Sequence, residues 1–210
     1  MEELLFRLRK RAHQFGIQVI FMDMRWGIRD ESTLTHDTWT ECANGIDWCK
    51  KGSMGIYFLS LQSLKYGYRF LPKNLSKDDL DRLECSAEVR QFISDWYIPD
   101  HNAILKECVL RNRSGVDNDS AFWEAYEMLL PALRGIPFDK KRYGGILRVG
   151  QSVTECEVRA ALSADPVEVD KETGLCWSHR QIEGEKTDKA FCDTANDADA
   201  KKLFDNLIAW

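Results

Sequence analysis

The expected fold is decided by two short apolar runs, Ile17-Gln18-Val19-Ile20-Phe21-Met22-Asp23-Met24 and Met54-Gly55-Ile56-Tyr57-Phe58-Leu59-Ser60. Nearly continuous apolar character over a short stretch is typical of strands that are covered on both faces of a parallel sheet. Apolar residues at helical spacing before the first run predict a helix that ends near Gly16. A second helix-like segment, residues 37–50, separates the two runs. This alternation predicts an α/β fold with a doubly wound, mostly parallel sheet in which the two runs are adjacent strands.

The middle third of the chain has a different pattern. Residues 76–96 and 120–133 are predicted to be helical, with a polar loop at 111–119 between them. We therefore expect a single domain over residues 1–210, with a helical insertion at 72–150. A late strand at 175–183 and a closing helix at 198–210 complete the prediction. Thr38 with Glu41, at the start of the 37–50 helix, has the spacing of a capping box.

Composition narrows the class of protein. Hydrophobic residues at 44% and charged residues at 30% are ordinary globular values, and no apolar run approaches the roughly 20 residues of a membrane helix. The formal charge of −5 and the lack of a long basic block argue against nucleic acid as a partner. Seven cysteines without a Cys-x-x-Cys pair indicate reduced thiols, so we expect a cytoplasmic protein without a metal site.

Three short strings follow or open the predicted elements: Asp23-Met24-Arg25-Trp26-Gly27-Ile28, Ser63-Leu64-Lys65-Tyr66-Gly67-Tyr68 and Ser152-Val153-Thr154-Glu155-Cys156-Glu157. As an ordered set they resemble the N-terminal TIR-like region that precedes the NACHT domain in NACHT and WD-repeat proteins. The resemblance runs nearly end to end and implies a TIR-like or flavodoxin-like fold. It also implies a signalling and protein-interaction module of a STAND-type ATPase in innate immunity. Its partners would be the NACHT ATPase module of the same or another chain, other proteins, or a second copy.

Asp23 stands at the carboxyl end of the first predicted strand, at the sheet edge that lines the ligand crevice in open parallel sheets. A carboxylate there would bind a ribose hydroxyl or position a loop. The alternative is an ion pair with Arg25 or Arg29, or a cap on the next segment. Trp26 would stack on a base, or supply buried area beside Gly27.

Ser60, Ser63 and Tyr66 follow the second predicted strand at the same edge of the sheet. Small polar residues in this position offer hydroxyls and backbone N–H groups to a ligand, and a short helix starting there favours an anion. Capping of the loop explains the same residues equally well.

The third string contains the best test of function. Ser152 and Glu155 have the spacing of a capping box, and this structural role explains both residues. It does not explain Glu157, which shares its helix face with small alanines and is expected to face a close-packed cleft. The resemblance implies that Glu157 is the glutamate that attacks or stabilises an anomeric carbon as an N-glycosidic bond breaks, with Ser152 as a ribose contact.

This gives an alternative function: a TIR-like effector that cleaves NAD or another nucleotide when it oligomerises, with no required cofactor. The fuller family pattern opens with a strand and a Ser/Thr-rich loop, whereas this chain opens with a helix. We therefore expect an interaction module; a purely structural spacer is a third possibility. No Gly-x-x-x-x-Gly-Lys-Ser/Thr string occurs, so the ATPase is not within these residues. If Glu157 lies in a concave pocket near Asp23 and Ser60, the nucleotide-cleaving hypothesis is favoured. If Glu157 is buried and paired, a scaffold role is favoured.

Overall fold

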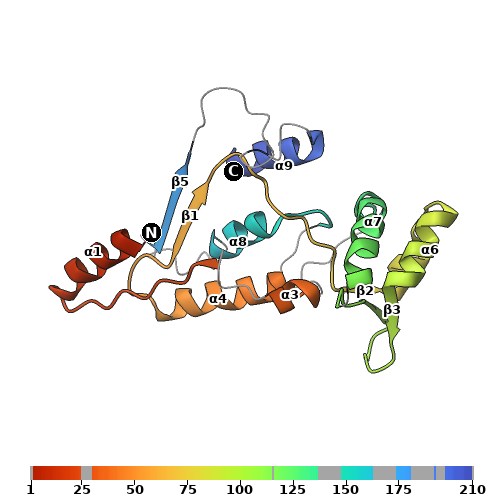
Figure 1. Ribbon diagram of the computed structural model, residues 1–210, viewed down its shortest axis with the longest axis horizontal. Coiled ribbons are helices and arrows are strands. Elements are labelled where there is room, and N and C mark those ends of the chain that lie inside the picture. Colours follow the sequence, from red (N-terminus) through yellow and green to blue (C-terminus); the bar gives the residue numbers. More distant parts are fainter. Residues whose placement is uncertain are drawn as a thin grey trace.

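The computed structural model of the chain describes residues 2–24, 30–114, 116–136, 148–162, 174–180, 192 and 197–209. In this part the chain is a mixed α/β structure, mostly helical, with two small sheets (Figure 1). The helices are α1 (Glu2–His13), α3 (Asp30–Leu34), α4 (Thr38–Gly52), α5 (Lys77–Arg82), α6 (Ala87–Trp96), α7 (Val116–Leu133), α8 (Val153–Leu162) and α9 (Ala198–Ile208). The strands are β1 (Phe58–Gln62), β2 (Asn74–Ser76), β3 (Tyr97–Asp100), β4 (Glu107–Leu110) and β5 (Leu175–His179). None of the helices described is long and apolar enough to cross a membrane.

The parallel sheet has two strands, β1 and β5, paired in register from Phe58 with Leu175 to Gln62 with His179. The predicted late strand is thus confirmed over its first five residues, and the second apolar run is a strand only from Phe58 onward. The prediction of a doubly wound sheet is wrong for the described residues, because they contain this one parallel pair.

The first apolar run is not a strand. Residues 17–23 have no regular secondary structure, and Ile17 and Ile20 are 55% and 63% exposed. Its end packs against α4: Met22 and Met24 lie over Gly45, where an added Cβ would come within 2.9 Å of the Met22 sulfur. Apolar continuity predicts burial between layers but does not determine which strands pair with each other. β1 pairs with β5 and not with the first apolar run.

Helix α1 ends as its sequence predicts. Gly16 adopts φ +70°, the Gly16 N–H donates to the His13 carbonyl, and the Ile17 N–H donates to the Ala12 carbonyl, both at 3.1 Å. These are the two hydrogen bonds of a Schellman motif, which needs a left-handed residue that glycine adopts without strain. None of the residues of α1 is buried, and the helix lies at one end of the molecule (Figure 1).

Helix α4 begins differently from its prediction. The N-cap is Asp37, without a side-chain cap hydrogen bond, so the capping box expected from Thr38 and Glu41 does not form. The Asp37 carboxylate instead accepts hydrogen bonds from Lys73 at 2.6 and 2.8 Å, which ties the start of α4 to the segment before β2.

Residues 74–110 contain an antiparallel sheet, in the order β2-β4-β3, that the sequence pattern did not predict. Its strands are only three or four residues long, too short for a period-two pattern to stand out. The predicted helix 76–96 is divided into α5 and α6, with Ser86 capping α6 by accepting from the Val89 N–H at 3.2 Å. The predicted 120–133 helix is confirmed as the body of α7. A single domain with an insertion at 72–150 stays a prediction.

The main core lies between this sheet, α6 and α7, and reaches α4 and α8 through Cys42 and Cys156. Leu75, Leu110 and Phe122 are at most 1% exposed, and burial of each such side chain stabilises the fold by about 1.5–3 kcal/mol.

The loop predicted at 111–119 takes part in this core. Arg113 is 3% exposed, and its guanidinium lies 4.7 Å from the Phe122 ring centroid and 5.1 Å from that of Trp123. Its side chain donates to the Thr33 carbonyl at 3.1 Å, so Arg113 connects α3 to α7. A residue expected in a solvated loop therefore packs on two aromatic rings.

Candidate functional site

The most buried charged group among the described residues of the third string is Glu155, whose side chain is 1% exposed in the first turn of α8. Its carboxylate accepts from Arg148 Nη2 at 2.6 Å, from Arg159 Nε at 2.7 Å and from the Tyr66 hydroxyl. We call Tyr66, Arg148, Ser152, Glu155 and Arg159 the Glu155 cluster. It joins the segment after β1 to the start of α8.

Ser152 caps α8, as predicted, but without the reciprocal half of a capping box. Its Oγ accepts from the Glu155 N–H at 3.1 Å. The Glu155 carboxylate is engaged with the arginines, and the Ser152 N–H donates to the Tyr66 hydroxyl oxygen at 3.2 Å. Tyr66 thus occupies the place that the glutamate side chain takes in a complete capping box.

The electrostatics of the cluster favour a charged Arg148 and a neutral Tyr66. Burial, together with the hydrogen bond to Glu155, raises the pKa of Tyr66 to about 12. Burial opposes the charge on Arg148, but the attraction of the Glu155 carboxylate outweighs it and raises the Arg148 pKa. The Glu155 side chain is thus held by two guanidinium groups and a phenol, an arrangement that stabilises a fixed geometry.

The space beyond the carboxyl end of β1 is filled by α9. Tyr66 is fully buried and packs with Ala200 and Phe204, and Leu64 forms a parallel bridge with Cys192. At the position where a ligand crevice was expected, the structure thus has side chains of α8 and α9.

Glu157 points in another direction. Side chains two positions apart on an α-helix point in directions that differ by about 200°, so Glu157 lies almost opposite Glu155 on α8. α8 packs against α4 on that side, and the buried Cys42 thiol donates a hydrogen bond to the half-buried Glu157 carboxylate. Burial raises the pKa of Glu157, and the thiol hydrogen bond offsets part of this shift. Burial and the carboxylate also raise the pKa of Cys42.

The remaining predicted site residues are distributed over the structure. Ser60 is buried within β1, and Ser63 follows that strand with its hydroxyl buried and without a hydrogen-bond partner among the described residues. Asp23 is half-buried between Met22 and Met24, and Trp26 lies outside the described residues. The structure therefore brings Tyr66 and Ser152 together, through Glu155, and places Glu157 against a different helix.

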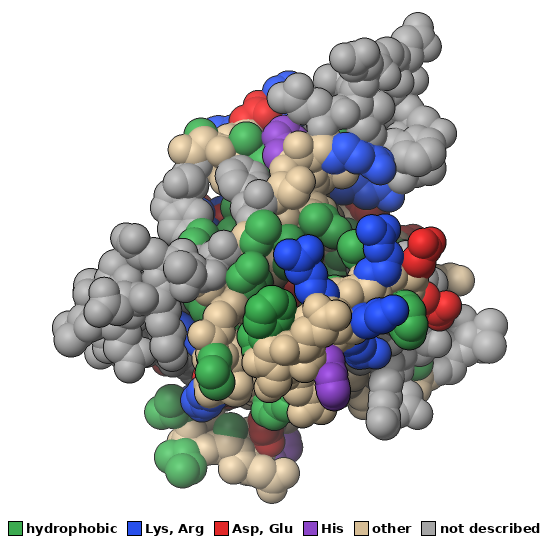
Figure 2. All heavy atoms as spheres, turned by 90° about the vertical axis from the view of Figure 1, so that its left-hand side faces the viewer, with side chains coloured by type: hydrophobic (Ala, Val, Ile, Leu, Met, Phe, Trp, Pro, Cys, Tyr) green, Lys and Arg blue, Asp and Glu red, His purple; other side chains and the backbone are tan. Residues whose placement is uncertain are grey.

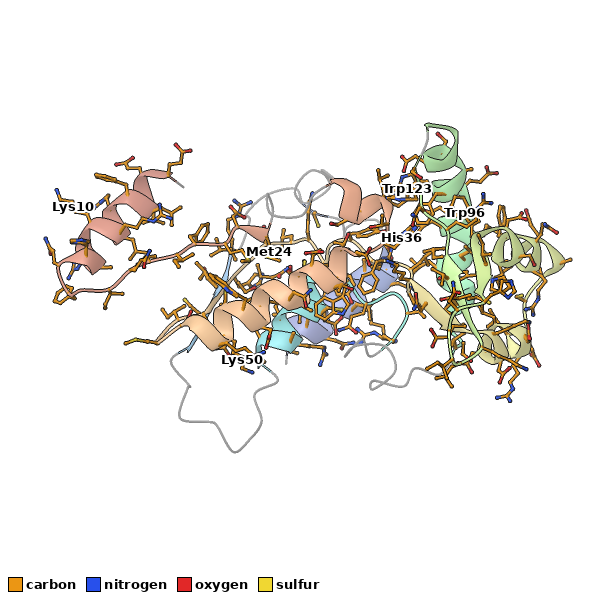
Figure 3. All side chains as sticks on the ribbon, turned by 90° about the horizontal axis from the view of Figure 1, so that it is seen from below. Lys10, Met24, His36, Lys50, Trp96 and Trp123 are labelled. Carbon is orange, nitrogen blue, oxygen red and sulfur yellow. The ribbon has the colours of Figure 1, made fainter. Side chains whose placement is uncertain are left out.

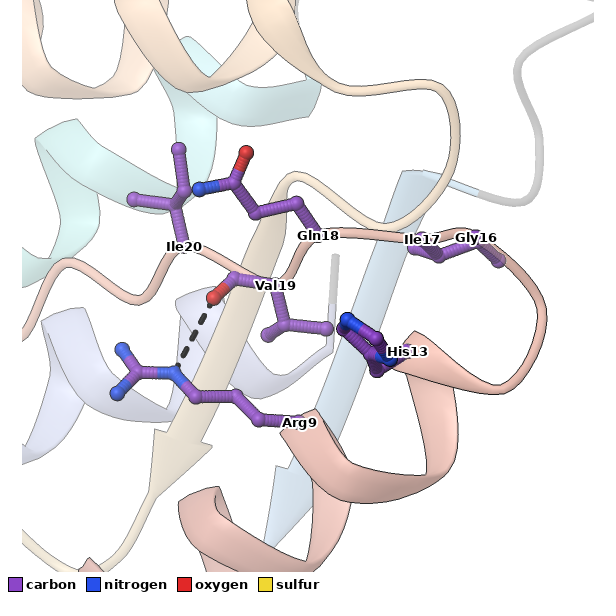
Figure 4. Close-up of a pocket in the computed structure, with 7 residues that line it drawn as sticks. All are labelled: Arg9, His13, Gly16, Ile17, Gln18, Val19 and Ile20. Carbon is purple, nitrogen blue, oxygen red and sulfur yellow. Dashed lines mark hydrogen bonds between the residues drawn. The ribbon is translucent and has the colours of Figure 1, made fainter.

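An open groove of about 650 Å³ lies between α1 and the segment that follows it, lined by Arg9, His13 and residues 16–20 (Figure 4). Arg9 Nε donates to the Val19 carbonyl at 3.2 Å across it. None of the predicted site residues that the structure describes lines this groove.

Two members of the Glu155 cluster were missed by the sequence analysis. The four-residue spacing of Glu155 and Arg159 is that of a helical ion pair and was available as a signal. Arg148 comes from outside the helix, and no local pattern indicates that it reaches Glu155.

Comparison with known proteins gives one informative similarity: the chain resembles part of a NACHT and WD-repeat protein. That relative is the human NACHT domain- and WD repeat-containing protein 1, with 26% identity over 182 residues. The match covers 82% of this chain and 11% of the relative, so the chain spans about a ninth of that protein. No family model matches the chain, and no solved structure matches it either.

Proposed function

We propose that the chain is a protein-interaction module of a cytoplasmic STAND-type ATPase that carries NACHT and WD-repeat parts. In this role it binds the NACHT ATPase module or another copy of itself and passes on a signal by association. The similarity to one region of a NACHT and WD-repeat protein supports this role.

The observation that carries the proposal is the exposure of large apolar side chains in the first 61 residues. The exposed set in this part of the chain is Leu4, Phe6, Leu8, Phe15, Ile17, Ile20, Met22, Trp48, Met54, Ile56, Leu59 and Leu61. Single exposed apolar residues are ordinary, but a concentration of them on one part of a domain marks a surface that another protein covers. On β1, Leu59 and Leu61 alternate with the buried Ser60 and Gln62, so one face of this strand is apolar and open.

Cleavage of NAD or another nucleotide has less support. That chemistry needs a carboxylate free to approach an anomeric carbon, with hydroxyls nearby to hold the ribose. Glu157 instead accepts a hydrogen bond from Cys42, while Ser152 and Tyr66 are bonded within the Glu155 cluster. These contacts favour structural roles for all three side chains.

The experiment is a binding measurement by isothermal titration calorimetry between this chain and the purified NACHT ATPase module of the human relative. We expect saturable binding that is weakened by Leu59→Ser with Leu61→Ser. The matched control is Leu162→Ser, which changes a similarly exposed leucine at the far end of α8. If the native chain binds neither the NACHT module nor itself with a Kd below about 0.1 mM, the proposal is wrong.

A further inference from the structure

Helix α1 has the composition of a docking element. Leu4 and Leu8 form an apolar stripe that continues to Phe15 just beyond the helix, and all three are about half exposed or more. Arg7 and Arg11, one helical turn apart, lie beside the stripe and are also exposed. An amphipathic helix gains most of its stability by covering its apolar side, and no residue of α1 is buried. Among the residues that the structure describes, none buries the apolar side of α1.

The opposite end of the molecule carries the opposite charge. Residues 74–107, from β2 to the start of β4, contain eight acidic and four basic residues, whereas α1 contains two acidic and four basic ones. Lys77 pairs with Asp81 at 2.7 Å, which engages one charge of each sign, and Arg90 donates to the carbonyls of Leu80 and Leu83. Asp78, Glu84 and Glu88 are exposed.

This acidic end also has exposed apolar side chains. Ile98 of β3 and Ile104 and Leu105 of the β3–β4 hairpin loop are 48%, 102% and 59% exposed. The Lys77 N–H donates to the Lys106 carbonyl at 3.0 Å, so the hairpin loop lies against the start of α5. Acidic and apolar groups are thus neighbours here, as basic and apolar groups are on α1.

The two surfaces cannot meet within one molecule. α1 and the β3–α6 region lie at opposite ends of the long axis (Figure 1), and Lys10 is far from Trp96 and Trp123 in a second view (Figure 3). Figure 2, which looks at the α1 end, shows hydrophobic side chains with Lys and Arg side chains beside them. A second copy of the chain would present the acidic and apolar surface of residues 74–107 to α1.

We propose that copies of the chain associate head to tail, with α1 of one copy on the acidic end formed by residues 74–107 of the next. The proposal rests on the proposed function, since it names the partner of an interaction module. Because the two surfaces differ, the contact is heterologous, and its repetition produces a closed ring or an open filament. A basic amphipathic helix also suits an anionic membrane. The acidic and apolar surface on the same chain favours the second copy, and membrane binding becomes an outcome of the test.

The test uses paired charge reversals in the full chain, with oligomeric mass measured by sedimentation velocity over a range of protein and salt concentrations. One variant carries Arg7→Glu and Arg11→Glu, and the other carries Glu84→Lys and Glu88→Lys. The matched control carries Lys65→Glu and Lys202→Glu, two exposed lysines outside both surfaces.

We expect the native chain and the control to associate, and high salt to weaken the association. Each variant alone should associate about tenfold more weakly, because attraction becomes repulsion at two positions. An equal mixture should recover association, since the reversed α1 of one variant matches the reversed acidic end of the other. Circular dichroism of each variant confirms that it is folded.

A monomeric native chain at every concentration, undiminished association of the α1 variant, or no recovery in the mixture would each overturn the proposal. A monomer that binds phosphatidylserine vesicles through α1, and loses this binding in the α1 variant, would assign the helix to a membrane. In either case binding to the NACHT module is measured separately, so the head-to-tail contact can fail while the interaction module stands.

Discussion

Replacement of Glu155 by Gln is the sharpest perturbation of the candidate site. The amide keeps the size and shape of the side chain but removes the charge that two arginines and a tyrosine surround. Arg148 and Arg159 then lose their ionic partner, and one amide N–H group faces guanidinium donors. We therefore expect a large loss of stability from a substitution that changes little volume.

The magnitude follows from the burial of each partner. Breaking a fully buried ion pair costs about 3–5 kcal/mol because a charge is left without compensation. The Arg148 and Arg159 side chains are 37% and 26% exposed, so water reaches both and reduces the cost. We expect a decrease of about 2 kcal/mol in the free energy of unfolding, or roughly 4–8 °C in Tm for a chain of this size.

The assay is urea unfolding followed by tryptophan fluorescence and by circular dichroism. Glu157→Gln is the matched control, since it is the same substitution two residues along the same helix. The amide oxygen of the glutamine still accepts from the Cys42 thiol. A neutral side chain also avoids the cost of burying a charge, which is the cost that raises the Glu157 pKa. The control should therefore stay within about 1 kcal/mol of the native chain at pH 7. Equal stability of Glu155→Gln and the native chain, or a larger loss in Glu157→Gln, would refute this reasoning.

Three further predictions concern Tyr66, Gly67 and His36. Tyr66→Phe removes both a hydrogen bond to Glu155 and the acceptor of the Ser152 N–H, and should lower the free energy of unfolding in urea by about 1–3 kcal/mol; an unchanged midpoint would contradict this. Gly67→Ala should lower the Tm, because Gly67 has φ +96° and a Cβ there would lie 2.9 Å from Thr154 Oγ1, whereas Gly55→Ala, with open space around it, should leave the Tm nearly unchanged. Burial lowers the pKa of His36 from 6.5 to about 4, so folding favours the neutral ring and its contribution to stability is lost as the pH falls from 6.5 toward 4. His36→Asn, which tolerates the φ of +62° at this position, should reduce the loss of stability between pH 7.5 and 5 by roughly 2 kcal/mol, and an identical loss in both proteins would exclude His36 as the cause.

Local signals in the sequence predicted several helices, but they missed α3 and merged α5 and α6 into one helix. The end of α1 at Gly16, the extents of α4 and α9, and the cap of α8 at Ser152 all depend on helical spacing and capping chemistry within a few residues. Strand pairing depends on partners far away in the chain. Apolar continuity indicated that residues 17–24 were buried, but β1 pairs with β5, and Ile17, Ile20 and Met22 of the run remain exposed.

Only part of the candidate site was predicted, because its contacts also join residues that are far apart in the chain. Tyr66 and Ser152 were singled out and do meet, but the group that joins them is Glu155, which the capping-box spacing explained without a further role. Arg148 completes the cluster from outside the helix, and only the folded chain reveals that contact. Glu157 was expected to face a cleft because alanines follow it at helical spacing. In the structure α8 packs against α4 instead, with Cys42 against the Glu157 carboxylate.

Nicotinamide release from NAD tests most directly the claim that the chain works by association and that Glu157 is structural. The purified chain is concentrated to promote assembly, incubated with NAD, and compared with Glu157→Gln and with a blank. We predict that the native chain and the variant both release nicotinamide at the rate of the blank. Turnover by the native chain that is absent in Glu157→Gln would contradict the claim and identify Glu157 as a catalytic carboxylate.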